Sequence, residues 1–343
     1  MLEIIMSIIA YIFFVMYFRY SLNKYHFNQN ISFILALPAF KITSILFIFE
    51  LHFVIISIIF EFIMSKLNIY YRKRNALFMI IPIPLILSLG LIYYGDYNMN
   101  NIIKTEYQIE TDKRLSKEYK IGLIADLHYG NNIDEYKLND IVKRIKKDNC
   151  DIVMLAGDII DEHTNIDERK ECFKILSNLN ETSKVIYVKG NHDKGKYSLD
   201  NKISDADLNT LIESYNIDVL NDEIIEINDE IRIVGRDDYS MHNRLAIDEY
   251  NIKDDKYNIV LDHQPKELEA CMNNNIDLHL SGHTHAGQIF PLYYLYELLN
   301  INELNYGLKL IDDMHAINTS GISGWGFGLR TDHHSEYVLV NIR

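Results

Sequence analysis

Five short clusters of aspartate, asparagine and histidine are the residues of this chain best suited to chemistry. Each follows a short, β-rich apolar run. The clusters are Asp126-Leu127-His128, Gly157-Asp158-Ile159-Ile160-Asp161, Gly190-Asn191-His192-Asp193, Asp262-His263-Gln264-Pro265 and Gly282-His283-Thr284-His285. Carboxylate, imidazole and amide ligands together suit borderline divalent ions such as Mn²⁺, Fe²⁺ or Zn²⁺ better than Ca²⁺. The pattern predicts a site for two metal ions.

The spacing within the clusters supports this prediction. Asp126 and His128 are two residues apart after a strand end, so both can turn toward one ion. Asp158 follows Gly157, and a glycine lets the backbone approach closely while the carboxylate bridges two cations. Two ions about 3.5–4 Å apart can activate a bridging water and clamp a phosphoryl oxygen. This is the chemistry of phosphoester hydrolysis.

The elements that must position these clusters alternate between strand and helix from residue 119 onward. Strands are predicted over Tyr119–Ala125, Asp151–Ala156 and Val185–Val188, with amphipathic helices over 136–148 and 166–178 between them. Such alternation predicts a parallel sheet flanked by helices. In these sheets the chemistry lies where loops leave the carboxyl ends of the strands, and the first three clusters occupy that place.

The second half of this region, from about residue 217, is richer in short strands and carries the remaining clusters. Strands are predicted over 223–227, 231–234, 259–261, 278–280 and 337–340. We expect this half to add its loops to the same rim of the fold. His279, within one of these strands, should point away from the rim because successive side chains alternate between the faces of a sheet.

The five clusters resemble, in content and order, the motifs of the calcineurin-like metallophosphoesterases. The series D-x-H, GD-x-x-D, GNHD, a lone histidine and GHTH covers roughly residues 119–343. The resemblance implies an α/β fold, a four-layer α-β-β-α sandwich, and a metal-dependent phosphoesterase with two divalent ions (Mn, Fe or Zn). The extended form over 283–291, together with apolar N-terminal segments, resembles a bacterial membrane-anchored branch of that superfamily.

The resemblance also implies a role for each motif residue. One metal would be held by Asp126, His128, Asp158 and His285, and the other by Asp158, Asn191, His263 and His283. The histidine of GNHD is not a ligand in that family, which implies that His192 faces the substrate and assists the leaving oxygen. Asp193 would accept a hydrogen bond from the His192 ring and fix its tautomer. Asp161 would support its loop rather than bind metal.

The first 95 residues predict an all-α transmembrane region. Residues 4–18 carry no charge and would extend about 22 Å as a helix. Residues 76–95 form a second apolar span. The stretch 31–64 would make about 50 Å of helix, which is too long for one crossing. Either Pro38 and Lys41 break it into a short entering segment and one span, or it folds as two tight spans near Glu50 and His52. Three and four spans both remain open.

Basic residues in the connecting loop predict the orientation. The short connection between 64 and 76 contains Lys66, Arg72, Lys73 and Arg74, and the positive-inside rule places it in the cytoplasm. One further span then puts everything that follows outside. We therefore expect a multi-pass protein of the cell membrane with an extracytoplasmic catalytic domain over 119–343.

Charge is distributed unevenly along the chain. Residues 1–95 hold seven basic and three acidic side chains, whereas residues 96–343 hold 27 basic and 45 acidic, a balance of −18. An acidic domain of this kind argues against an electrostatic grip on nucleic acid. Residues 96–118, rich in Asn, Lys and Glu, are predicted to form a solvated tether that includes an edge strand.

The functional hypothesis is a membrane-anchored phosphoester hydrolase in which a metal-activated water attacks phosphorus. Location at the bilayer favours a lipid-linked or envelope phosphoester as substrate and partner. The alternative is a non-catalytic metal-binding receptor or scaffold of the same fold, although the sequence lacks none of the ligands. A protein phosphatase would need a cytoplasmic domain, which the basic loop opposes.

Overall fold

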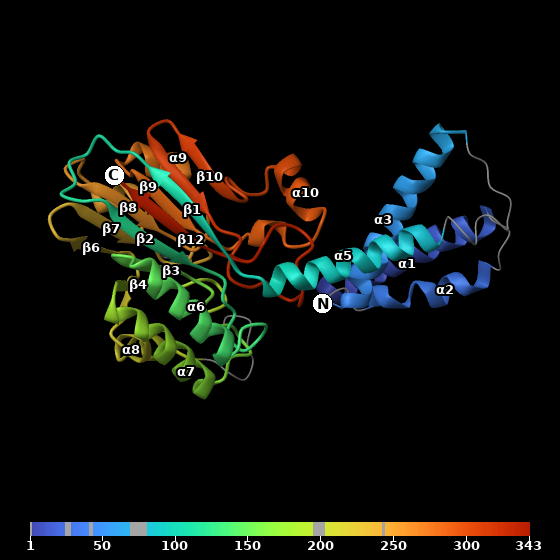
Figure 1. Ribbon diagram of the computed structural model, residues 1–343, viewed down its shortest axis with the longest axis horizontal. Helices are drawn as coiled ribbons and strands as arrows, with labels where there is room; N and C mark the ends of the chain where they lie inside the picture. The colour runs from blue at the N-terminus through green and yellow to red at the C-terminus, as the bar shows by residue number, and fades with distance from the viewer. Residues whose placement is uncertain (1, 25–28, 41–43, 69–80, 195–202, 242–243) are drawn as a thin grey trace. The chain divides into compact units, whose positions relative to one another are not determined.

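The computed structural model describes residues 2–24, 29–40, 44–68, 81–194, 203–241 and 244–343 (Figure 1). These residues form two compact units. The first consists of Met1–Tyr97 with Gly326–Thr331, and the second of Asn98–Trp325 with Asp332–Arg343. The first is helical and the second is built on two β-sheets.

Three long helices dominate the first unit: α1 (Leu2–Lys24), α3 (Ile45–Lys66) and α5 (Pro82–Asn100). Among the described residues, three short helical segments precede α3: a 3-10 turn over Gln29–Ile31, α2 (Ser32–Leu35) and a 3-10 turn over Leu37–Phe40. The inner faces of the helices share a small apolar core. Elsewhere large apolar side chains are exposed, which is typical of a surface that contacts lipid or protein.

Within the described residues, two helical segments are long and apolar enough to cross a membrane: Met6–Lys24 and Ile45–Lys66. The side-chain oxygen of Ser44 accepts a hydrogen bond from a backbone N–H in the first turn of α3, so this helix has a defined start. Helix α3 runs without a break through Glu50 and His52, where the alternative of two tight spans would place its turn. The predicted span over 76–95 begins outside the described residues and continues into α5.

The first sheet of the second unit has six strands. Their order across the sheet is β1 (Ile103–Ile109), β12 (Glu336–Ile342), β2 (Tyr119–Ile124), β3 (Ile152–Ala156), β4 (Lys184–Val188) and β5 (Asp218–Val219). Strands β2 to β5 are parallel, as predicted. The edge strand expected within 96–118 is confirmed as β1, which lies parallel to β12.

One strand was predicted in the wrong half. The apolar run over 337–340 belongs to β12, which lies in the first sheet, antiparallel to β2. All seven residues of β12 are buried, so the strand requires neighbours on both edges and cover on both faces. Its insertion between β1 and β2 makes the first sheet mixed rather than wholly parallel.

The second sheet also has six strands. Their order is β10 (Gly307–Ile311), β11 (Met314–Asn318), β9 (Leu278–Ser281), β8 (Tyr257–Leu261), β7 (Ile231–Gly235) and β6 (Glu223–Ile227). Strands β7, β8 and β9 are parallel, and β11 continues this direction beside β9. The hairpin of β10 and β11 was not predicted, because β10 is a short edge strand without clear alternation.

Helices accompany both sheets. Helices α6 (Glu135–Asp148), α7 (Ile166–Leu176) and α8 (Asp205–Glu213) pack on the first sheet and share its apolar core (Figure 1). The shorter α9 (Leu268–Asn273) packs on the second, and α10 (Leu292–Leu299) follows the last motif. A further core contains residues of both sheets, which therefore face each other. The predicted mixed α/β class is confirmed.

The helix α6 shows how local sequence places these elements. Its apolar residues Leu138, Ile141, Val142 and Ile145 follow helical spacing and are all buried. The side chain of Asp134 caps its first turn by accepting the N–H of Lys137 at 2.8 Å. The helix is therefore held with its apolar face on the sheet, and the loop before it remains beside the ends of the strands.

Candidate metal centre

All five clusters lie directly after the carboxyl ends of parallel strands. Asp126 and His128 follow β2, Asp158 follows β3, Asn191 to Asp193 follow β4, His263 follows β8, and His283 and His285 follow β9. The backbone at five of these residues has positive φ: Asp126 at 54°, His128 at 45°, Asp158 at 51°, His283 at 76° and His285 at 50°. Non-glycine residues seldom adopt this conformation, and those that do gather at functional sites.

Gly157 allows the strand ends of the two sheets to approach each other. Its φ is +80°, and a Cβ there would lie 2.6 Å from the backbone nitrogen of Gly190 and 2.7 Å from Nδ1 of His263. Real side chains do not tolerate such distances. The glycine is therefore required for the close contact of the loops after β3, β4 and β8, as the sequence predicted for the residue before Asp158.

One group of potential ligands surrounds Nε2 of His263. This atom lies 3.2 Å from Oδ2 of Asp158, 3.1 Å from Oδ1 of Asn191 and 3.0 Å from Nδ1 of His283. The other ring nitrogen of His263 is 2.9 Å from the carbonyl oxygen of Ala156, which accepts a hydrogen bond from Nδ1–H. That contact leaves the lone pair of Nε2 directed at the group, as expected for a metal-binding imidazole.

A second group consists of Asp126, His128 and His285. One possible ligand atom from each lies within 4.8 Å of the others. Nε2 of His285 is 3.7 Å from Oδ1 of Asp126. Both ring nitrogens of His128 are buried and have no hydrogen-bond partner among the described residues. Buried polar atoms are normally paired or bound to metal, so these residues fit a cation.

The carboxylate of Asp158 lies between the two groups. Its Oδ2 is 3.2 Å from Nε2 of His263 and 3.9 Å from Nε2 of His128. Its Oδ1 accepts the backbone N–H of His192 at 2.8 Å, which fixes the orientation of the carboxylate. Asp158 is almost fully buried, so one side chain can serve both groups without competition from water.

The electrostatics of the centre suit cation binding. Burial lowers the pKa of His128 to about 4, and burial likewise lowers that of His283 to about 4. Burial acts in the same direction at His263, but the nearby Asp158 carboxylate outweighs it and raises the pKa of that ring. Burial thus favours neutral imidazoles at His128 and His283, whose lone pairs, with the buried carboxylates nearby, suit divalent ions.

His192 lies at the edge of the centre. Its ring centroid is 5.4 Å from that of His128 and 5.5 Å from that of Trp325. Its Nδ1 is 2.8 Å from Oε2 of Glu162. Burial alone would lower the pKa of His192, but the contact with Glu162 outweighs it and raises the pKa. Glu162 is therefore the carboxylate that holds this imidazole.

Comparison with known proteins identifies the family of the chain. The model of the calcineurin-like phosphoesterases matches residues 119–287. An uncharacterised metallophosphoesterase of Helicobacter pylori is 32% identical over 320 residues, which cover 90% of this chain and 82% of the relative. One of Campylobacter jejuni is 31% identical over 269 residues, covering 76% and 68%. A transmembrane protein with metallophosphoesterase domain from Danio rerio is 25% identical over 281 residues, covering 76% and 62%.

The chain belongs to the calcineurin-like metallophosphoesterases. The resemblance predicted from the five motifs is thereby confirmed, and so is the prediction of a metal-dependent phosphoesterase. Membership implies divalent metal ions, and the described residues contain two groups of side chains that can hold them. The family match begins at Tyr119, where β2 begins.

In this metallophosphoesterase Asp193 differs from its predicted role. Its carboxylate accepts the backbone N–H groups of Asp158, Ile160 and Gly190 at 2.6, 3.0 and 2.7 Å, rather than a hydrogen bond from the His192 ring. The prediction was wrong in this respect, because neighbours in sequence on a tight loop point in different directions. Asp193 instead ties the loop after β4 to the loop after β3.

Asp161 supports its loop, as predicted. Its oxygens accept the side-chain amide of Asn131 at 3.0 Å and the backbone N–H of His163 at 2.8 Å. It lies 3.9 Å from Nδ1 of His128, close enough to orient that ring. His279 is fully buried and lies 4.0 Å from Asp262.

Two residues beside His192 were missed. Glu162 directly follows the GD-x-x-D motif, so an acidic residue on a loop already known to reach the site was the available signal. Trp325 stands in the glycine-rich segment over 321–328, and its backbone N–H donates to Oε1 of Gln288 at 3.1 Å. The tryptophan itself carried no motif.

Proposed function

We propose that this metallophosphoesterase is a membrane-anchored hydrolase of phosphoesters that works with two divalent metal ions. The observation that carries the proposal is the position of Asp158 Oδ2 between His263 and His128. A carboxylate placed in this way can bridge two cations. We further propose that the two sheets and their helices form the four-layer α-β-β-α sandwich of the family; the core shared by both sheets supports this.

Each ion would take its ligands from the strand ends described above. Asp126, His128, Asp158 and His285 would hold one, and Asp158, Asn191, His263 and His283 the other. When bound, divalent cations activate water as a nucleophile and neutralise charge on the phosphoryl oxygens. Mn²⁺, Fe²⁺ and Zn²⁺ all suit this mixture of oxygen and nitrogen ligands.

His192 would assist the departure of the leaving group. The contact of Nδ1 with Glu162 would keep a proton on that nitrogen and fix the ring, and Nε2 would transfer a proton to the leaving oxygen. The exposed Trp325 beside His192 offers an apolar surface to the leaving group. These two residues would therefore contact the part of the substrate that varies between phosphoesters.

We propose a cell-membrane location with the catalytic unit outside the cytoplasm. Two apolar helices support this location, and the Danio rerio relative is named a transmembrane protein. The basic connection over 66–74 supports the orientation. An enzyme anchored in this way meets lipid-linked and envelope phosphoesters rather than cytosolic nucleotides. The acidic balance of residues 96–343 makes nucleic acid an unfavourable partner.

Hydrolysis of two model substrates by the purified full-length protein tests the proposal. Bis-p-nitrophenyl phosphate reports diesterase activity and p-nitrophenyl phosphate reports monoesterase activity, each with Mn²⁺, Fe²⁺ or Zn²⁺ added after chelation. We expect metal-dependent release of nitrophenolate from at least one substrate, and none from an Asp126→Asn/His128→Ala double variant. Tight binding of metal without hydrolysis of either compound would favour a non-catalytic receptor.

A further inference from the structure

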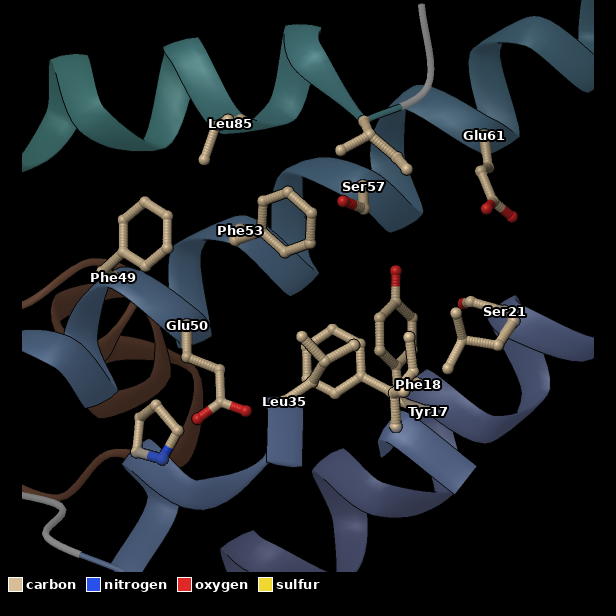
Figure 2. A pocket seen from close by; sticks show the side chains of 14 residues that line it. Tyr17, Phe18, Ser21, Leu35, Phe49, Glu50, Phe53, Ser57, Glu61 and Leu85 are labelled. Carbon is tan, nitrogen blue, oxygen red and sulfur yellow. The ribbon is translucent and has the colours of Figure 1, made fainter. Parts of the chain in front are cut away.

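The helical unit contains a cavity of about 500 Å³ (Figure 2). Side chains of α1, α2, α3 and α5 line it, among them Phe18, Leu35, Phe53 and Leu85. Its size falls within the range of roughly 300–1,000 Å³ that is usual for small-molecule sites, and such sites combine apolar walls with few polar groups. The phosphoesterase chemistry uses none of these residues.

Glu50 is the unusual residue of this cavity. It belongs to α3, its side chain is only 3% exposed, and it is directed into the cavity (Figure 2). Neither carboxylate oxygen has a hydrogen-bond partner among the described residues. The backbone N–H of Ala39 faces the carboxylate but donates to the carbonyl oxygen of Ala36 at 3.1 Å. Burying an ionised carboxylate without a partner is costly, so Glu50 either stays protonated or pairs with a cation that the described residues do not supply.

The other polar groups of the cavity already have partners. Glu61 forms an ion pair with Lys24, with Nζ 2.6 Å from Oε2. The hydroxyl of Tyr17 is hydrogen-bonded to Ser21 and Ser57. Among the described residues that line the cavity, Glu50 is therefore the ionisable group that lacks a counterpart within the chain.

We propose that this cavity binds a single-chain amphiphile with an ammonium head. The alkyl chain lies along Phe18, Leu35 and Phe53, where it replaces water on apolar side chains. The ammonium group donates hydrogen bonds to the carboxylate of Glu50, so neither charge remains buried alone. A carboxylate head is excluded by repulsion from Glu50, and an alcohol leaves the charge of Glu50 uncompensated.

Native mass spectrometry of the full-length protein in an uncharged sugar detergent tests the proposal, with dodecylamine, dodecanol and dodecanoic acid as probes of equal chain length. We expect one dodecylamine per chain, weaker binding of dodecanol and no binding of dodecanoate. Glu50→Gln keeps the shape of the side chain but removes its charge, and should weaken dodecylamine binding about tenfold or more. Glu50→Asp keeps the charge and should retain most of the binding.

Two further variants test the volume of the cavity and the effect of its other carboxylate separately. Ser21→Phe places a ring in the cavity and should abolish binding of dodecylamine. Glu61→Gln removes a carboxylate that already has a partner and should leave the affinity for dodecylamine unchanged. Circular dichroism confirms that each variant is folded. Equal affinity for all three probes would overturn the proposal, since the cavity would then accept any alkyl chain.

Cationic side chains outside the described residues, such as that of Lys41, are another possible source of a counter-charge. Lys41 lies outside the described residues, and if it neutralised Glu50 then Glu50→Gln would bind dodecylamine as the unchanged protein does. That result would equally overturn the proposal. Neither result bears on hydrolysis, which depends on residues of the other unit.

Discussion

At the scale of single residues, the carboxylate of Asp158 lies between the two groups of potential ligands and would serve both. Asp158→Asn should lower the metal content of the folded protein and abolish hydrolysis, because an amide cannot supply negative charge to two cations. Elemental analysis of purified protein measures the content. Glu181→Gln is the control; this exposed carboxylate pairs with Lys146, so the variant should retain both metal and activity. Full metal content in Asp158→Asn would refute the bridging role.

His192 is assigned to the leaving group and not to a metal. His192→Ala should therefore keep the metal content while lowering turnover by roughly 10²–10⁴-fold, the usual contribution of general acid–base catalysis. The loss should be smaller for p-nitrophenolate, which needs little protonation on departure, than for an alkyl alcohol. Steady-state rates on the two kinds of ester measure the difference. Loss of metal from this variant would show that His192 is a ligand.

Glu162 would act on the reaction through the ring of His192, which it contacts at 2.8 Å. Glu162→Gln should lower turnover, but less than His192→Ala does. The imidazole remains in this variant, and only the contact that orients it and raises its pKa is weakened. The ratio of rates for alkyl and nitrophenyl esters is the decisive readout, since a purely structural defect would lower both equally. Glu181→Gln, at an exposed carboxylate 65% accessible, is the control.

At the scale of elements, the site depends on how closely the loops after β3, β4 and β8 approach. Gly157→Ala should destabilise the second unit by about 2 kcal/mol or more, because alanine at φ +80° is strained and its Cβ would meet Gly190 and His263. Thermal inactivation and metal content both report this effect. Gly90→Ala in α5 is the control, since a Cβ there meets nothing within 4 Å. Equal thermal behaviour of the two variants would contradict the close-packing argument.

At the scale of the whole molecule, the orientation in the membrane is open to direct measurement. Cys150, Cys172 and Cys271 are all buried, so a new surface cysteine should be the one that reacts. Asn101→Cys should react with a membrane-impermeant maleimide in intact cells, whereas Leu67→Cys should react only after the cells are opened. The opposite pattern would place the catalytic unit in the cytoplasm and remove the case for an envelope substrate.

The types of most elements, and the residues that gather at the strand ends, could be predicted from the sequence because both depend on nearby residues. Asp126 and His128 lie two residues apart after an apolar run, and Leu138, Ile141 and Ile145 repeat at helical spacing, so local patterns carry the information. Motif order then indicated which clusters belong to one site. The group around His263 contains the predicted residues Asp158, Asn191 and His283.

Other features depended on segments that are distant in the chain, and only the tertiary structure decided them. Strand β12 enters the first sheet because its seven buried residues need neighbours on both sides, which no local pattern encodes. Glu162, rather than the adjacent Asp193, contacts His192 because two separate loops meet there. The unpartnered Glu50 likewise becomes visible only when several helices enclose it, since burial is a property of packing and not of sequence.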